Sequence, residues 1–258
     1  MGPPPVPALP ATVARLAGAL AELPGAAAVV LGGSRADGTE RPGSDWDLGL
    51  YYRAGFDPAA VGRLGHPGHV SALGEWGPIV DGGAWLTVAG VAVDVLFRDL
   101  DRVGRWVADA REGRFEILSQ NGYLAGAPTY LTVGELALCR PLAGEPLPRP
   151  GFPDRLAATA PARWEGRAAV SLMFAATHAR AGDVVACAGM LAEATLCAAH
   201  ARLAARRAWV RNEKRLVARA GLDAVGPLLA RPGATAVELG ATVGAVADAL
   251  GIAPLAAR

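Results

Sequence analysis

A strictly alternating octapeptide, DWDLGLYY at residues 45–52, constrains the fold more than any other part of the chain. Side chains on a strand point alternately to its two faces, so Asp45 and Asp47 share one face while Trp46 and Leu48 share the other. The pattern predicts a half-buried strand from which two carboxylates project together. The apolar face of such a strand must be covered, which indicates a sheet packed against at least one helix.

The residues before this strand predict a helix, a first strand and a loop. Residues 12–23 carry apolar side chains at helical spacing, and Thr12 is a candidate N-cap. Residues 26–31 (AAAVVL) form a short apolar run that is typical of a buried strand. Residues 32–44 are polar and rich in glycine, so we expect a loop between the two strands.

The residues after it predict a hairpin and a change of domain. Strands at residues 84–88 and 91–97 flank Ala89-Gly90, a pair typical of a hairpin turn. Residues 54–80 are rich in glycine and proline, and we predict no element there. The proline-rich run at residues 140–153 is typical of a linker or of the boundary between two domains.

Beyond that run the apolar positions recur at helical spacing, with Gly182 and Asp183 as a stop and a cap between two long helices. Asp99 or Asp101 can cap an earlier helix. The chain therefore predicts an α+β fold: a small mixed β-sheet domain over residues 1–145, followed by an all-α domain over residues 146–258.

Charge and cysteine content narrow the classes of function. The formal net charge is only +1, whereas a protein that wraps a long nucleic acid carries a marked basic excess. Three scattered cysteines do not form a disulfide framework. Charged residues interrupt the apolar stretches before the roughly 18 residues of a membrane span accumulate, and the N-terminus has no signal-peptide pattern. We expect a cytoplasmic protein.

Three features that suit phosphate and metal ligands follow one another in the first domain. Gly33 and Ser34 come directly after a predicted strand, where a missing Cβ lets the backbone approach a phosphate. Asp45 and Asp47 are placed to hold one or two Mg²⁺ ions, which prefer oxygen ligands. Asp94 lies in an apolar strand, where an acid is costly to bury unless a metal or another partner satisfies it.

In this order, GGS, D-x-D and a lone Asp in a hydrophobic strand resemble the signature of the DNA polymerase β-like nucleotidyltransferase superfamily. Within it, the chain is similar to the small-molecule branch that includes aminoglycoside nucleotidyltransferases. The resemblance implies a palm-like nucleotidyltransferase domain over residues 1–145 and a helical substrate-binding domain over residues 146–258.

The resemblance also implies roles for the acids and the glycine-rich loop. Asp45, Asp47 and Asp94 would hold two Mg²⁺ ions, with Mn²⁺ as an alternative. Gly33 and Ser34 would hold the terminal phosphates of a nucleoside triphosphate, expected to be ATP. A hydroxyl of a small acceptor, such as an aminoglycoside-like antibiotic, would attack the α-phosphorus in line and expel pyrophosphate.

Three further residues are candidates for supporting roles. Arg35 could pair with phosphate charge, or it could form a structural ion pair. Glu193, an acid inside an apolar helix, resembles the helical general base of kanamycin-type relatives; an ordinary helix-face glutamate is the alternative, and Asp94 is the other candidate base. Lys214 could reach the triphosphate or belong to a solvated basic face.

Several alternatives stay open. The acids could be solvated or, for Asp94, ion-paired, and the acceptor could be a protein side chain or an RNA end. A non-catalytic nucleotide-sensing relative is a further alternative, although the three acids are intact. A homodimer is compatible with the apolar helical half. Tryptophans could stack on a base or sugar, but without a spacing argument we treat five of them as packing or surface residues: Trp76, Trp85, Trp106, Trp164 and Trp209.

Overall fold

The computed structural model describes residues 9–41 and 43–255, which form two compact units. The first unit comprises Met1–Asp109, Phe115–Asn121 and Ala127–Gly151, and the second comprises Ala110–Arg114, Gly122–Gly126 and Phe152–Arg258. The first unit thus extends to Gly151, whereas we expected the boundary after residue 145. Short segments of the chain between residues 110 and 126 also belong to the second unit.

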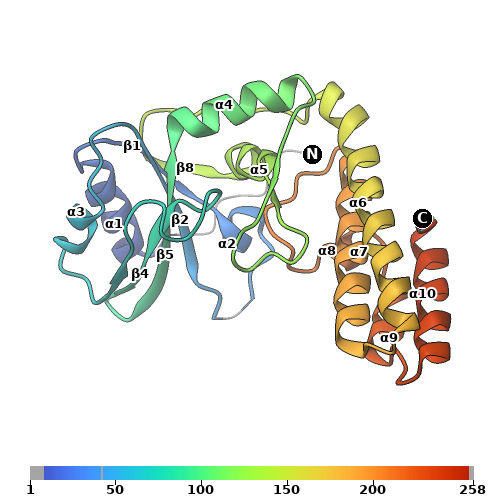
Figure 1. Ribbon diagram of the computed structural model, residues 1–258. Coiled ribbons are helices and arrows are strands. Elements are labelled where there is room, and N and C mark those ends of the chain that lie inside the picture. The colour runs from blue at the N-terminus through green and yellow to red at the C-terminus, as the bar shows by residue number, and fades with distance from the viewer. Residues whose placement is uncertain (1–8, 42, 256–258) are drawn as a thin grey trace. The chain divides into compact units, whose positions relative to one another are not determined.

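The first unit is built on a six-stranded mixed sheet with the order β3-β4-β5-β2-β1-β8 (Figure 1). Its strands are β1 (Ala26–Leu31), β2 (Trp46–Tyr52), β3 (Gly68–Val70), β4 (Gly82–Val88), β5 (Val91–Asp99) and β8 (Arg140–Gly144). A separate two-stranded sheet pairs β6 (Ile117–Leu118) with β7 (Ala127–Pro128). The helices that accompany these strands are α1 (Ala11–Ala21), α2 (Gly33–Asp37), α3 (Ala59–Gly62), α4 (Leu100–Arg111) and α5 (Tyr130–Leu138).

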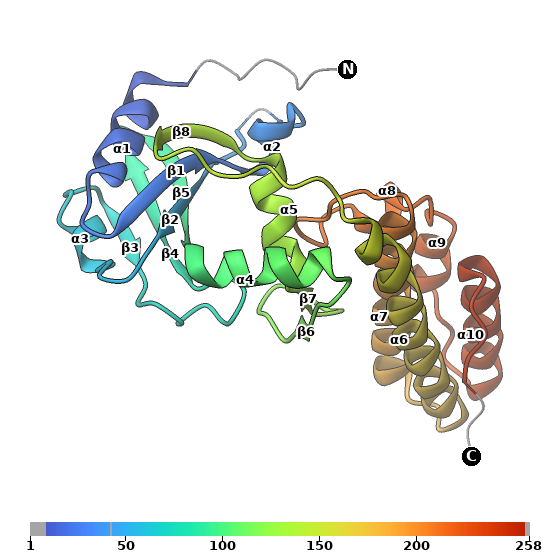
Figure 2. The same ribbon diagram turned by 90° about the horizontal axis from the view of Figure 1, so that it is seen from above.

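The two faces of the sheet have different roles, as the alternation in β2 predicts. Trp46, Leu48 and Leu50 are buried in a core that also contains Leu16 and Leu20 of α1. Each such side chain contributes about 1.5–3 kcal/mol through its removal from water. Figure 2 shows α1 and α5 on opposite faces of the sheet. The carboxylates therefore project from the face that α1 does not cover.

Several local expectations are confirmed. The hairpin joins β4 and β5 through Ala89 and Gly90, whose φ angles of 49° and 81° are both positive, as a two-residue type I′ turn requires. Asp99 caps α4, because its Oδ1 accepts hydrogen bonds from the amides of Asp101 and Arg102 at 2.9 and 3.0 Å. Thr12 is not the N-cap of α1, which begins one residue earlier at Ala11.

The boundary between the two units falls within residues 140–153, as expected, but not all of this run is a linker, and the expected loops contain short elements. Part of the run at residues 140–153 is β8, an edge strand that pairs antiparallel with β1. An edge strand tolerates Pro141 because its free side needs no amide donor. Residues 54–80 contain α3 and β3, and the loop after β1 contains the short helix α2. These elements are short, and β8 pairs with a strand that is far away in the sequence, so the local sequence carries little periodicity.

The second unit is helical and has a core of its own. Its helices are α6 (Asp154–Arg180), α7 (Val184–Ala205), α8 (Leu216–Arg219), α9 (Val225–Ala230) and α10 (Ala236–Leu250). Asp183 caps α7 as expected, accepting a hydrogen bond from the amide of Ala186 at 3.0 Å. Contrary to our expectation, α7 is long and apolar enough to meet the criterion for a membrane span; half of its apolar window is buried inside the fold, as in the core helix of a folded bundle. The α+β architecture is confirmed.

Candidate active site

Two of the three predicted carboxylates lie directly opposite each other. β2 and β5 are parallel neighbours, and their register pairs Asp47 with Asp94. Partners in register share a face and neighbouring strands lie about 4.8 Å apart, so both side chains project side by side from the face opposite α1. Asp45 precedes β2 by one residue and is exposed, whereas Asp47 and Asp94 are half-buried. Long-range pairing thus joins acids that are far apart in the sequence.

Gly33 lies against the Asp47 carboxyl group. The φ angle of Gly33 is +61°, and a Cβ built on it would overlap that carboxyl group, lying 2.8 Å from Asp47 Cβ. The amide of Gly32 donates to the Asp47 carbonyl oxygen at 2.8 Å. The missing side chain therefore lets the loop after β1 contact β2 at the predicted metal ligand, which gives the glycine of the GGS motif a physical reason.

Ser34 and Arg35 follow in the first turn of α2. The Arg35 guanidinium lies 4.2 Å from the centroid of the Trp46 ring and donates to the carbonyl oxygens of Ser44 at 2.5 Å and Asp45 at 3.1 Å. It thereby ties α2 to the start of β2. This geometry favours a positioning role for Arg35; its contact with phosphate remains a prediction.

β8 adds a positioning residue that the sequence analysis missed. Arg140 is buried and donates from Nε to the carbonyl oxygen of Ala36 at 2.7 Å. The guanidinium thus holds the end of α2 from the edge of the sheet. An arginine next to a proline in an apparent linker offered no local signal for this role.

The predicted metal ligands Asp47 and Asp94 share a face of the sheet, but the described residues do not form a complete metal-coordination site. Within residues 9–41 and 43–255, no three His, Cys, Asp or Glu side chains lie together closely enough to hold a metal ion. Like charges on neighbouring strands repel, and a cation bound between two carboxylates would offset that repulsion. The donor set fits a hard divalent cation in its chemistry, since Asp47 and Asp94 lie in register and both carboxylates are partly exposed.

The far end of the same face is closed by α5. Arg98, which is 2% exposed, forms a two-pronged ion pair with Glu135 of α5, with N–O distances of 2.7 and 2.9 Å. Tyr51 lies opposite Arg98 in the strand register, and burial, reinforced by the charge of Glu135, raises the pKa of the Tyr51 hydroxyl. The face is therefore covered at the carboxyl ends of β2 and β5, while Asp45 at the other end remains exposed.

Glu193 and Lys214 belong to the helical unit. The Glu193 side chain is 15% exposed and its Oε1 lies 2.7 Å from an Arg167 guanidinium nitrogen. Lys214 is exposed, and its amide donates to Asn212 Oδ1 at 3.0 Å. Glu193 is thus a half-buried carboxylate that is ion-paired with Arg167. This arrangement is compatible with a role as general base and equally with a structural ion pair within the bundle.

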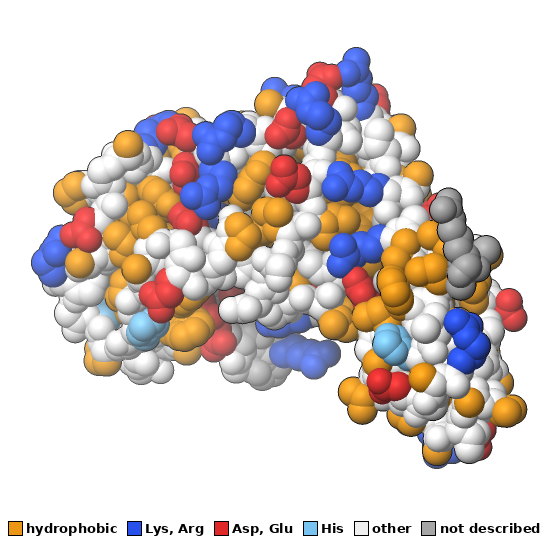
Figure 3. All heavy atoms as spheres, viewed as in Figure 1, with side chains coloured by type: hydrophobic (Ala, Val, Ile, Leu, Met, Phe, Trp, Pro, Cys, Tyr) orange, Lys and Arg blue, Asp and Glu red, His pale blue; other side chains and the backbone are white. Residues whose placement is uncertain are grey.

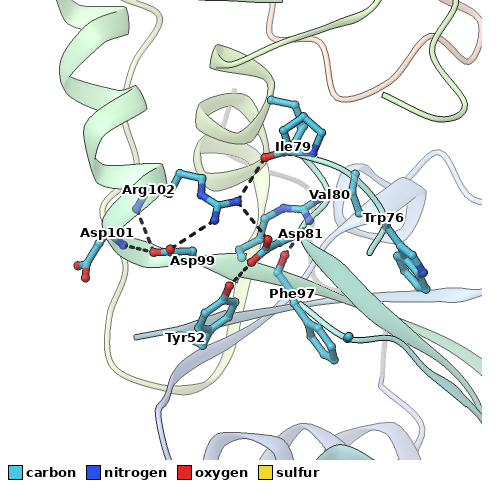
Figure 4. Close-up of polar contacts among 12 residues, drawn as sticks. Tyr52, Trp76, Ile79, Val80, Asp81, Phe97, Asp99, Asp101 and Arg102 are labelled. Atoms are coloured by element: carbon cyan, nitrogen blue, oxygen red, sulfur yellow. Dashed lines mark hydrogen bonds and ion pairs between the residues drawn. The ribbon is translucent and has the colours of Figure 1, made fainter. Parts of the chain in front are cut away.

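A second polar cluster lies at the end of β2, and the sequence analysis did not anticipate it (Figure 4). Asp81 is 4% exposed, accepts a hydrogen bond from the Tyr52 hydroxyl, and pairs with Arg102 of α4 at 3.1 Å. Burial and the hydrogen bond to Asp81 raise the pKa of Tyr52. Asp99 contacts the same Arg102 at 3.8 Å. The cluster fixes the segment that leads into β4.

Charged side chains are intermixed over the face of the molecule drawn in Figure 3, where neither sign forms a continuous stripe. A nucleic-acid backbone is bound by such a stripe of Lys and Arg. This distribution agrees with the formal net charge of +1.

Comparison with known proteins bears on the part of the chain that carries the loop and the D-x-D pair. Residues 13–77 match the family model described as nucleotidyltransferase domain. This segment of the chain is thus similar to a nucleotidyltransferase domain. The matched segment contains Gly33, Ser34, Asp45 and Asp47; Asp94 lies beyond it, and the strand register brings it opposite Asp47.

Comparison with solved structures gives a distant similarity. The chain is similar to a nucleotidyltransferase-like protein from Exiguobacterium sibiricum 255-15, with 10% sequence identity, a TM-score of 0.44, and coverage of 90% of this chain and 70% of that chain. Comparison with curated proteins gave no match.

Proposed function

We propose that the nucleotidyltransferase domain uses divalent metal, expected to be two Mg²⁺ ions, to move a nucleoside monophosphate from ATP or a related triphosphate to a hydroxyl of a small-molecule acceptor. The observation that carries the proposal is the register of Asp47 with Asp94, together with the contact between Gly33 and the Asp47 carboxyl group. A site for a metal–triphosphate complex needs carboxylates for the cation and a glycine turn for the phosphates. In this chain Gly33 of the turn contacts the Asp47 carboxyl group.

Each part has a separate task. The amides of the turn at Gly33 and the hydroxyl of Ser34 are proposed to bind the oxygens of the terminal phosphates. Asp45, Asp47 and Asp94 are placed to bind the cations, which, when bound, stabilise the charge on both the entering and the leaving oxygen. Arg35 keeps α2 and β2 together through its contacts with Ser44 and Asp45.

The reaction balances without a further co-reactant. An acceptor oxygen forms a bond to the α-phosphorus while the bond from that phosphorus to the bridging oxygen of the β-phosphate breaks, and pyrophosphate leaves with the bonding electrons. The hydroxyl proton passes to a carboxylate. Asp94 and Glu193 are the two candidates.

A direct assay tests this proposal. The full chain is incubated with α-labelled ATP, MgCl₂ and a panel of aminoglycosides, lincosamides and candidate proteins, and pyrophosphate and label are followed. Label on a small molecule together with pyrophosphate release supports the proposal. Label on a polypeptide or an RNA end would change the acceptor class, and tight ATP binding without turnover would indicate a sensor and overturn the proposal.

Variants identify the residues responsible. Asp45→Asn, Asp47→Asn and Asp94→Asn should each lower metal-dependent turnover by about 10³-fold or more while the thermal midpoint is retained, because these acids project from the sheet and do not pack its core. Asp101→Asn is the matched control, since its carboxyl group is exposed in the same domain and belongs to α4. Full activity of the Asp47 variant would refute the mechanism.

A further inference from the structure

The register that pairs Asp47 with Asp94 continues across two more strands. Asp94 lies opposite Trp85 of β4, and Trp85 lies opposite His69 of β3. Residues in register share a face of the sheet, so His69, Trp85, Asp94 and Asp47 form one row from the edge strand to the proposed metal site. Neighbouring positions in this row are about 5 Å apart. An aromatic side chain therefore stands directly beside a predicted catalytic carboxylate.

The indole of Trp85 is exposed to solvent, although it is a large aromatic side chain. Trp85 is 54% exposed, and Trp76 stacks on it with ring centroids 4.6 Å apart and an interplanar angle of 23°. The His69 ring is 5.9 Å from the Trp85 ring. The absence of a side chain at Gly83 leaves room for the Trp76 ring, because a Cβ built on Gly83 would lie 2.8 Å from the Trp76 Cη2 atom. The two stacked indoles and the His69 ring thus form an aromatic surface over β4, in which Trp76 covers one face of the Trp85 ring.

Hydrogen bonds from Gln120 hold the loop that carries Trp76 in place. Buried Gln120 donates from Nε2 to the Trp76 carbonyl oxygen at 2.5 Å and accepts at Oε1 from the amides of Ile79 and Val80, both at 3.2 Å. Asp81, at the end of the same loop, is anchored by Tyr52 and Arg102, as Figure 4 shows. Fixing the loop that carries the half-buried Trp76 in advance reduces the conformational entropy that the protein would otherwise lose on binding a ligand.

The order of the strands decides which substrate this surface faces. The sheet runs β3-β4-β5-β2-β1, so the loop at Gly33 lies on one side of the Asp47–Asp94 pair and Trp85 lies on the other. In an in-line transfer the leaving pyrophosphate and the attacking hydroxyl approach the α-phosphorus from opposite sides. With the terminal phosphates at Gly33, the attacking hydroxyl comes from the side of Trp85.

We propose that Trp76 and Trp85 form the acceptor subsite and bind a hydroxylated saturated ring, such as a sugar or aminocyclitol ring, by stacking. The inference rests on the proposed function for the direction of attack. The C–H face of such a ring suits the electron-rich indole face, and an amino group on the ring would add attraction to the same face. The hydroxyls on its rim suit the neighbouring Asp94 carboxylate and His69 imidazole, whereas a wholly apolar ring would need a deeper site.

Calorimetric titration of the full chain with kanamycin A, without nucleotide, tests the subsite independently of turnover. We expect Trp85→Ala to raise the Kd by at least about tenfold, a change of about 1.4 kcal/mol. Trp85→Phe, which keeps an aromatic face, should stay within about threefold of the wild type. Thr87→Ala is the matched control, because Thr87 is exposed on the same face of β4 and lies outside the row; its Kd should not change.

The Kd for ATP with Mg²⁺ is measured on the same proteins and should be unchanged in Trp85→Ala. A loss of ATP affinity in that variant would place the nucleobase on the indoles and overturn the proposal. Equal kanamycin affinity in Trp85→Ala and the wild type, or no binding by the wild type, would overturn it as well. Trp85-dependent binding without any pyrophosphate release would instead overturn the transfer reaction and leave the ring-binding subsite standing.

Discussion

Replacing Gly33 with alanine should disable the active site through a single added methyl group. The φ angle of Gly33 is +61°, in the left-handed region, and its Cα faces the Asp47 carboxyl group. The new Cβ would lie 2.8 Å from Asp47 Cβ, closer than real Cβ atoms approach other heavy atoms. Either the loop or the carboxylate must move, and both belong to the proposed metal–triphosphate site.

Two costs add in the Gly33→Ala variant. A non-glycine residue in the left-handed region costs about 1–2 kcal/mol. Overlap in a packed contact adds about 1–3 kcal/mol, depending on how far the neighbour can give. We therefore expect the free energy of unfolding to fall by about 2–5 kcal/mol. Turnover should fall by about 10²-fold or more, since a shift of about 1 Å in a reacting group has that effect.

Gly182→Ala is the control for the backbone cost alone. Gly182 has a φ angle of +70°, and a Cβ built on it meets no described atom within 4 Å. Urea denaturation of both variants gives the difference in free energy of unfolding, and pyrophosphate release with ATP and Mg²⁺ gives the difference in activity. If Gly33→Ala and Gly182→Ala lost equal stability and both kept wild-type turnover, the contact between Gly33 and Asp47 would have no role in the site.

Two further predictions concern the helical unit. Burial, with a smaller contribution from Arg219, lowers the pKa of His200 to about 3, and its ring stacks on Trp164 at 4.3 Å. The unfolded chain then binds more protons than the folded one between pH 6.5 and 3, so the free energy of unfolding falls as the pH drops through that window. His200→Phe should reduce this dependence on pH by up to about 1.4 kcal/mol per pH unit, as measured by urea titrations at several pH values. An unchanged dependence on pH would contradict the assignment. Glu193→Gln can still accept the hydrogen bond from Arg167, so if Glu193 is the base, turnover should fall by about 10²-fold or more and the acidic limb of the pH–rate profile should disappear. Unchanged turnover with the true acceptor would assign the proton to Asp94.

Local sequence was sufficient wherever the structure depends on neighbours in the chain. The alternation at residues 45–52 predicted which side chains enter the core, and Ala89-Gly90 predicted the hairpin. The caps at Asp99 and Asp183 follow from residues within one helical turn. In each case the physical cause, a dihedral preference or a hydrogen bond to a nearby amide, acts over a few residues.

The elements that the sequence analysis missed depend on distant partners. β8 is a strand because β1 offers an edge to pair with, although its proline content is typical of a linker. Gln120 is important because it fills the hydrogen-bonding needs of a loop about forty positions earlier in the chain. A single buried glutamine or arginine has no periodicity, so its role is visible only when the partner is in place.

In the candidate site, too, some features follow from the local sequence and others depend on distant partners. The sequence by itself determined that the first domain carries a glycine turn and a strand with two carboxylates on one face, because strand geometry and the missing Cβ of glycine are local properties. Only the tertiary structure decided that Asp94 stands opposite Asp47 and that Trp85 stands opposite Asp94. Strand register is set by the burial of the opposite face and by hydrogen bonds between strands that are far apart in the chain, and no local pattern contains it.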